Sequence, residues 1–448
     1  MTRRQRSASG AADGAGAPVG SGLVGRVLAW ARIPLYANAL VLMGNTGLSA
    51  GLGFIFWALA ARLYPPAQVG LASATISAAV FVATLAQLGL PTALIRFSPE
   101  AGANRRILTS TVLMTVTLAG AAAAAVLVLG IGSLAPSIAD LASPVVLAAS
   151  VISLSATTAA FSILIFIAVG ARDARPALAG GVTQGVVKSG LVLLFAVLLA
   201  RDGFSLVLAW ILGTLAAIVI QAWMLRAQLA PSVNFHTLRL GSFLRFSAGN
   251  YAGDLAWTAP SLLFPLLVLS QLGAEANAYF YVAWAIASLL IGIPFAVASS
   301  LLAEGSHQHG ATDGHFRRAM VLTLGLVLPA IAVCWVTAPL LLSLFGASYA
   351  ENGVETLRLL ALAALPMSIN LLHLSVARLD RALLRILGIS AATGVGSLVL
   401  GAIFAPAIGS VGIAVAYLVA HTIVAVALSL GWWLRGSSGR PREAAPAS

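Results

Sequence analysis

Charged residues are scarce in this sequence. Only 8% of the 448 residues are Asp, Glu, Lys or Arg, whereas about a quarter are charged in an average soluble domain. Hydrophobic residues make up 60%, and apolar runs of roughly 20 residues recur from Leu35 to Leu434, each long enough to cross a bilayer as a helix. These properties exclude a soluble protein and predict an all-α polytopic membrane protein.

Motifs for catalysis and metal binding are also missing. The sequence has no Walker A lysine motif, no H-E-x-x-H motif and no serine nucleophile elbow in a suitable context. Cys334 is the single cysteine, so an intrachain disulfide is excluded. His307, His309, Asp313 and His315 lie close together in a polar loop, but no second group of ligands follows at metal spacing. We therefore expect no metal, no cofactor and no enzymatic activity.

Lysine is almost absent. Lys188 is the only one, and arginine supplies the rest of the 25 basic residues. The net charge of +12 could suggest a nucleic-acid partner, but the arginines lie between the apolar runs and form no basic face. The composition therefore gives no support for nucleic-acid binding.

The apolar runs predict twelve spans in two lobes of six helices. They lie near 35–60, 68–92, 107–130, 144–169, 177–199, 204–225, 246–271, 277–302, 318–345, 354–377, 383–404 and 411–434. We assign residues 1–33 to a disordered cytoplasmic tail with a short interfacial helix, 34–225 to the first lobe, 226–245 to a cytoplasmic linker, 246–434 to the second lobe and 435–448 to a cytoplasmic tail.

The arginines predict the orientation of these spans. With a cytoplasmic N-terminus, the outer segments contain only Arg62, Arg201 and Arg358, and the inner segments contain 21 arginines. This asymmetry satisfies the positive-inside rule and places both termini in the cytoplasm of a multi-pass cytoplasmic-membrane protein. Gly44-Asn45 near the start of the first span recurs as Gly249-Asn250 near the start of the seventh, which is typical of a parallel repeat.

Lys188 is a candidate site residue because of its depth. It lies about eleven residues into the fifth span, near mid-membrane at a rise of about 1.5 Å per residue. Gly181, Gln184, Gly185, Lys188 and Ser189 share one helix face by their 3–4 spacing, which predicts a wall facing water or a neighbouring helix. The alternative is a purely structural ion pair.

Asp254 is the one acidic residue clearly inside a span. Asn250 precedes it by four residues, so the two share a face of the seventh span. Asp254 is interpreted either as a gating or coupling residue, or as the partner that neutralises Lys188 or an arginine at a span end. His373 and His421, each inside a span, are expected to be neutral packing residues.

The first two spans carry a family resemblance. They read N-T-G-L-S-A-G-L-G-F-I-F-W-A-L-A-A-R-L-Y-P-P-A-Q-V-G-L-A-S-A-T and then L-A-Q-L-G-L-P-T-A-L-I-R-F. This resembles the polysaccharide-transporter branch of the multidrug/oligosaccharidyl-lipid/polysaccharide flippase superfamily. The matching residues are Asn45, Gly53, Phe54, Ala61, Arg62, Gly70, Ser73, Leu88, Gly89, Leu90, Ala93 and Arg96.

The resemblance implies a MATE-like fold and a flippase for a lipid-linked oligosaccharide or polysaccharide precursor on a polyprenyl diphosphate. It further implies alternating access through a V-shaped cationic cavity between the lobes. We expect the substrate-binding residues of this cavity to be Lys188, Gln184, Asn45, Asn250, Arg62 and Arg96, with Asp254 as the residue for H⁺ or Na⁺ coupling or as the ion-pair partner of Lys188. The expected partners are the lipid-linked glycan, membrane lipids and glycan-synthesis enzymes, and the protein is expected to act as a monomer.

Two alternatives remain open from the sequence. A multidrug or cation antiporter of the same superfamily is disfavoured, because no acid lies between Arg32 and Glu100 and the antiporters carry one in the first span. A membrane-embedded glycan polymerase or ligase needs room for an extracytoplasmic site, and every predicted outer loop has about 13 residues or fewer.

Overall fold

The computed structural model describes residues 34–134, 138, 143–235, 240–307 and 312–437, and within these residues every regular element is a helix. The predicted all-α class is therefore confirmed. The elements, in chain order, are α2 (Pro34–Leu63), α3 (Pro66–Ala86), α4 (Leu90–Phe97), η1 (Pro99–Asn104), α5 (Arg105–Leu134), α7 (Pro144–Gly170), α8 (Arg175–Leu198), α9 (Gly203–Met224), α10 (Leu240–Leu272), α11 (Ala274–His307), α12 (Thr312–Ser343), α13 (Ala347–Leu379), α14 (Leu383–Ile408) and α15 (Ser410–Ser437).

Most of these helices have the length and composition of membrane spans. Eleven described helices are long and apolar enough to cross a bilayer, and Gly47–Leu63 within α2 forms a further, shorter apolar helix. The second predicted span differs from the prediction, because α3 ends at Ala86 and a separate short helix, α4, follows. Gly89 adopts the left-handed conformation with φ of 72°, and Pro91 lies in the first turn of α4, so the chain turns between the two helices.

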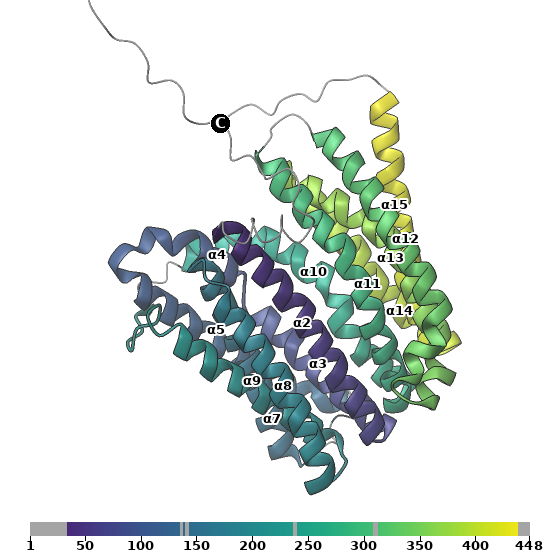
Figure 1. Ribbon diagram of the computed structural model, residues 1–448, viewed down its shortest axis with the longest axis horizontal. Helices are drawn as coiled ribbons and strands as arrows, with labels where there is room; N and C mark the ends of the chain where they lie inside the picture. Colours follow the sequence, from purple (N-terminus) through teal and green to yellow (C-terminus); the bar gives the residue numbers. More distant parts are fainter. Residues whose placement is uncertain (1–33, 135–137, 139–142, 236–239, 308–311, 438–448) are drawn as a thin grey trace, which may run out of the picture.

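The helices form two lobes. In the N-terminal lobe, α2 packs against α8, α8 against α9 and α5 against α7. In the C-terminal lobe, α10 packs against α14, α14 against α15, and both α11 and α12 against α13. Figure 1 shows the first lobe in purple to teal on the left and the second in green to yellow on the right, with α3 and α11 between them.

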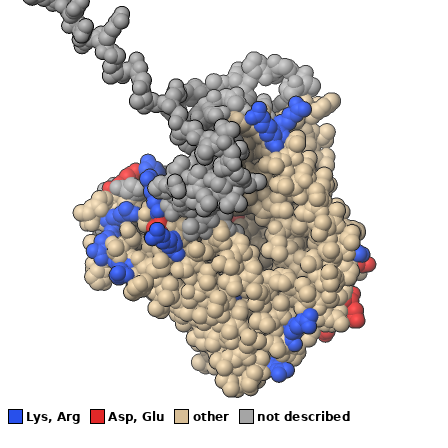
Figure 2. Space-filling model, viewed as in Figure 1, with Lys and Arg blue, Asp and Glu red and all other residues tan. Residues whose placement is uncertain are grey.

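The bundle has two ends, which we name by residues. The Arg62 end is where α2 ends and α3 begins, and the Arg96 end is where α4 ends and α5 begins. Figure 2 shows the Lys and Arg side chains gathered toward the two ends of the molecule, with a broad band of uncharged surface between them. This distribution is typical of a protein whose middle contacts the hydrocarbon of a bilayer.

The lobes pack directly against each other at the Arg62 end. Gly70 of α3 lies so close to α11 that a Cβ placed on it would be 1.7 Å from the carbonyl oxygen of Ala274. Asn277 of α11 is fully buried there, and its Nδ2 donates to Gly70 O at 2.7 Å and to Ser73 Oγ at 3.1 Å. Small residues let two helix backbones approach closely, and a buried amide then hydrogen-bonds across the contact.

Candidate functional site

The polar stripe of α8 packs against two helices of its own lobe. A Cβ on Gly181 would lie 2.5 Å from Asn45 Oδ1 of α2, and a Cβ on Gly185 would lie 2.5 Å from the Leu52 side chain. On the other side, a Cβ on Gly213 of α9 would lie 2.9 Å from Cβ of Lys188. The sequence predicted that this stripe faces either water or a neighbouring helix. In the structure it faces the neighbouring helices α2 and α9.

Lys188 is held by aromatic rings. Its side chain is 5% exposed, and Nζ lies 3.8 Å from the ring centre of Trp210 on α9 and 5.0 Å from that of Phe56 on α2. Within the described residues, no acidic group lies within ion-pair distance of this ammonium. The electron-rich faces of the rings attract the cation, and such contacts contribute about 2 kcal/mol or more when water is excluded. In this conformation the rings, rather than water, surround the charge.

Two other predicted residues belong to the same packed region. Gln184, one turn before Lys188, donates from Nε2 to Thr214 Oγ1 at 2.9 Å. Asn45 accepts from Ser49 at 3.3 Å and faces α8 through the contact with Gly181. We call Lys188, Phe56 and Trp210 the Lys188 site, and Gln184 and Asn45 line the helix contacts that surround it.

The Lys188 site reaches the boundary between the lobes. Trp57 follows Phe56 in α2, and its ring centre is 6.1 Å from that of Trp210. On its other side Trp57 contacts Tyr281 of α11, with ring centres 4.6 Å apart. A continuous group of aromatic side chains therefore connects the buried ammonium in one lobe to a helix of the other lobe.

Asp254 has a different partner from the one expected. Its Oδ1 accepts from Arg378 Nη2 at 2.5 Å, and the two side chains are 56% and 33% exposed. Arg378 lies in the last turn of α13, in the same lobe as Asp254, whereas Lys188 lies in the other lobe. Asp254 therefore pairs with an arginine at the end of a span, which is one of the two predicted partners, and does not pair with Lys188. Asn250, one turn before Asp254, is exposed.

The two arginines expected among the substrate-binding residues, Arg62 and Arg96, make separate contacts. Arg62 crosses between the lobes, and its Nε and Nη2 donate to the carbonyl oxygens of Leu344 at 2.7 Å and Ser343 at 3.1 Å. These carbonyls lie at the C-terminal end of α12, where the helix dipole favours a cation. Arg96 pairs with Glu100 one turn later, on an exposed surface. Neither arginine is among the residues that contact Lys188.

Some of the residues described above could be predicted from the sequence and others could not. His421 is buried, and Nδ2 of Asn370 donates to its backbone carbonyl oxygen at 2.9 Å, as expected of a packing residue. Trp210, Phe56 and Arg378 were not predicted. The signal for Trp210 was available, because it lies about two turns inside its helix, deeper than the usual position of tryptophan at the membrane interfaces.

Comparison with known proteins identifies the family. The sequence profile of the polysaccharide biosynthesis protein family matches residues 35–303, so the chain belongs to this family. The resemblance read from the first two spans is therefore confirmed. Comparison with curated proteins gave no match.

Solved structures identify the fold. An inward-facing multidrug resistance MATE family transporter of the MOP superfamily aligns with a TM-score of 0.71 and 17% identity, covering 88% of this chain and 96% of that one. The lipid II flippase MurJ in its inward closed conformation aligns with a TM-score of 0.71 and 15% identity, covering 88% and 87%. A MOP superfamily transporter from Pyrococcus furiosus aligns with a TM-score of 0.61 and 16% identity, covering 92% and 98%. The MATE-like fold of this multi-pass membrane protein is thereby established.

Proposed function

We propose that this protein is a flippase that carries a lipid-linked oligosaccharide or polysaccharide precursor, on a polyprenyl diphosphate, across the cytoplasmic membrane by alternating access. Membership of the polysaccharide biosynthesis family and the fold shared with MATE and MurJ support transport of an envelope glycan precursor. The observation that carries the proposal is the buried ammonium of Lys188, which has aromatic rings but no acidic partner among the described residues.

A diphosphate needs help to cross the membrane, because moving a charged group through about 30 Å of hydrocarbon is very unfavourable. In this proposal the rings of the Lys188 site stabilise the ammonium while no substrate is bound. A diphosphate that enters from the Arg96 end takes the place of the rings beside the ammonium while the lobes are still packed together at the Arg62 end. Separation of α2 from α11 then breaks the contact of Trp57 with Tyr281 and opens the site at the Arg62 end. A substrate shifts the equilibrium between packed and separated lobes only if it binds one of these conformations more tightly than the other.

The remaining parts of the proposal concern the membrane and the coupling ion. The asymmetry of the arginines supports a cytoplasmic Arg96 end and cytoplasmic termini. If H⁺ or Na⁺ drives transport, Asp254 is the residue on which it would act, by competing with Arg378 for the carboxylate. The isoprenoid tail of the substrate would remain among membrane lipids, and glycan-synthesis enzymes would supply the precursor to a monomeric protein.

The two alternative functions receive less support. A multidrug or cation antiporter of this superfamily is disfavoured because no acidic residue lies between Arg32 and Glu100, and the first span therefore carries none. A glycan polymerase or ligase needs an extracytoplasmic site, yet the described connections at the Arg62 end are short. They comprise residues 64–65, 199–202, 273, 344–346 and 409.

Reconstitution tests the role of Lys188. The protein is placed in liposomes with a fluorescent polyprenyl-diphosphate oligosaccharide, and flipping is followed by the fraction of probe that an impermeant quencher reaches. We expect Lys188→Gln to lose most of the flipping rate and Lys188→Arg to retain part of it. Gly190→Ala serves as the control on the same helix, because its added methyl group has no neighbouring atom within 4 Å.

Two results would contradict the proposal. Flipping by Lys188→Gln at the wild-type rate would show that the ammonium does not bind the diphosphate. In cells, depletion of the protein should cause a lipid-linked glycan intermediate to accumulate on the cytoplasmic face, and the absence of any such intermediate would argue against a flippase.

A further inference from the structure

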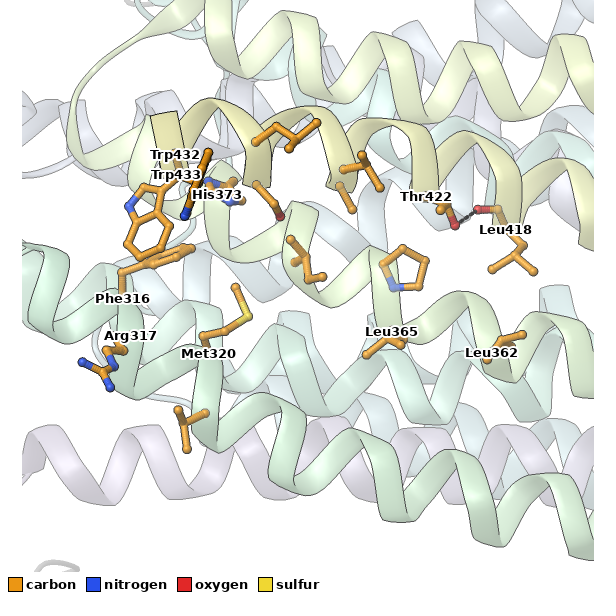
Figure 3. A pocket seen from close by; sticks show the side chains of 17 residues that line it. Phe316, Arg317, Met320, Leu362, Leu365, His373, Leu418, Thr422, Trp432 and Trp433 are labelled. Carbon is orange, nitrogen blue, oxygen red and sulfur yellow. Dashed lines mark hydrogen bonds between the residues drawn. The ribbon is translucent and has the colours of Figure 1, made fainter. Parts of the chain in front are cut away.

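The C-terminal lobe contains a large apolar groove. It has a volume of about 930 Å³ and lies between α12 and α15, with α13 as its floor (Figure 3). Leu365 and Ile369 form part of the floor, and Met320, Leu418 and Val426 form part of the walls. The volume falls within the range of about 300–1,000 Å³ that is usual for ligand pockets.

The groove faces away from the other lobe. Tyr349 and Gly353 of α13 contact α11, through the ring of Tyr279 and its carbonyl oxygen. At 100° per residue, Leu365 and Ile369 lie on the opposite side of α13 from these two residues. Since α11 in turn packs on α3 of the N-terminal lobe, the groove opens on the outer surface of the bundle, within helices that span the membrane. A membrane lipid can therefore enter it from the side.

The length of the groove matches one leaflet. On α13 it extends from Leu362 to His373, which is about 16 Å at the rise of an α-helix. Half of the hydrocarbon thickness is about 15 Å, so the groove is as long as one acyl chain of one leaflet. It begins at the Arg96 end with Trp432 and Trp433, and tryptophans are typical of the boundary between hydrocarbon and headgroups (Figure 3).

Among the described residues that line the groove, Arg317 is the one arginine or lysine. Arg317 lines the mouth of the groove, is exposed, and makes no ion pair with another described residue. None of the residues that line the groove is acidic. An arginine beside an apolar channel at headgroup depth is complementary to a lipid with a negatively charged phosphate.

We propose that this groove is a binding site for an anionic phospholipid, with one acyl chain over α13 and the phosphate on Arg317. The lipid connects α12 to α15, which flank α13 on either side of the groove. It is distinct from the flippase substrate, because the groove lies on the surface opposite to the boundary between the lobes. The proposal therefore does not depend on the proposed function.

Binding is measured on the intact, purified protein in detergent, by titrating phosphatidylglycerol or phosphatidylcholine and counting bound lipids by native mass spectrometry. We expect preferential binding of phosphatidylglycerol, and about fivefold weaker binding in Arg317→Gln, since one basic residue near an anionic headgroup contributes about 1 kcal/mol. Arg318→Gln is the matched control, because Arg318 lines a separate pocket between α11 and α12. Its affinity for phosphatidylglycerol should remain that of the wild type.

A second pair of variants tests the apolar part. Val426→Trp should fill the groove and abolish the tight lipid site, whereas Ile423→Trp, on the same helix but outside the groove, should not. The two positions are 51% and 61% exposed, so both variants are expected to fold.

Three results would overturn the proposal. The first is equal binding of the two phospholipids, or an equal effect of the Arg317 and Arg318 variants. The second is displacement of phosphatidylglycerol by polyprenyl phosphate at lower concentration, which would assign the groove to the substrate tail. The third is a dimeric wild-type protein that Val426→Trp converts to a monomer, which would make the groove a contact between two copies.

Discussion

Gly70→Ala offers a direct test of how the lobes pack at the Arg62 end. The added methyl carbon would lie 1.7 Å from the carbonyl oxygen of Ala274 and 2.7 Å from its carbonyl carbon. Both atoms belong to the backbone of α11, so neither can move aside by a side-chain rotation. Ordinary van der Waals contact begins at 3.4 Å, and the helices must therefore separate locally by roughly 1.7 Å.

The expected energy follows from this geometry. Overpacking of a close contact costs about 1–3 kcal/mol, which changes an equilibrium between packed and separated lobes about 5- to 150-fold. Separation also lengthens two hydrogen bonds between the lobes, which Asn277 Nδ2 donates to Gly70 O at 2.7 Å and to Ser73 Oγ at 3.1 Å. The variant should thus populate a conformation in which α3 and α11 are apart at the Arg62 end.

Double electron–electron resonance measures this separation. Spin labels at Leu198→Cys and Leu340→Cys, both exposed and near the Arg62 end of different lobes, report the distance in a Cys334→Ala background. We expect a longer distance to gain population in Gly70→Ala. Gly53→Ala is the control, because nothing lies within 4 Å of its added methyl group. An unchanged distance distribution in a stably folded Gly70→Ala protein would refute the close packing of α3 on α11.

Three further predictions concern the contacts of the candidate residues. Arg62→Gln should favour the longer spin-label distance, as Gly70→Ala does, but should change the equilibrium between packed and separated lobes by only about 1 kcal/mol, because the bonds to Ser343 and Leu344 are exposed to solvent. A larger effect than that of Gly70→Ala would contradict this order. Asp254→Asn and Arg378→Gln should reduce flipping similarly, and the exchanged pair Asp254→Arg with Arg378→Asp should recover part of the rate; no recovery would argue that the ion pair has no role. Trp210→Leu should lower the free energy of unfolding by about 2 kcal/mol or more, because the contact of the ring with the buried Lys188 is lost. Trp335→Leu removes an exposed contact with Arg358 and should change the free energy of unfolding by less than about 1 kcal/mol; equal losses would contradict the packing of Lys188 on Trp210.

The membrane-spanning fold could be predicted because its determinants are local. The length of an apolar run decides whether a helix can cross a bilayer, and this length is counted directly from consecutive residues in the sequence. The break between α3 and α4 also had a local signal in Gly89 and Pro91, although the apolar run alone predicted one continuous span. Family membership could be predicted from the first two spans for the same reason, since Asn45 to Arg96 form one contiguous stretch.

The partners of the charged residues within the spans could not be predicted in this way. Asp254 and Arg378 are 124 residues apart, and their contact depends on where α13 ends relative to α10. The sequence offered Lys188 and an arginine at a span end as equally suitable partners by charge. Only the tertiary contacts distinguish them, because Arg378 lies beside Asp254 whereas Lys188 lies against Trp210 and Phe56.

What the sequence by itself determined is therefore the class of protein, the approximate spans and the depth of Lys188, because these depend on composition and on the rise of a helix. What only the tertiary structure decided is the surroundings of that ammonium. Glycines at 181, 185 and 213 let α2, α8 and α9 approach closely, and this approach places Phe56 and Trp210 over the charge. Which rings meet which cation depends on the packing of residues distant in the chain, and no local pattern encodes it.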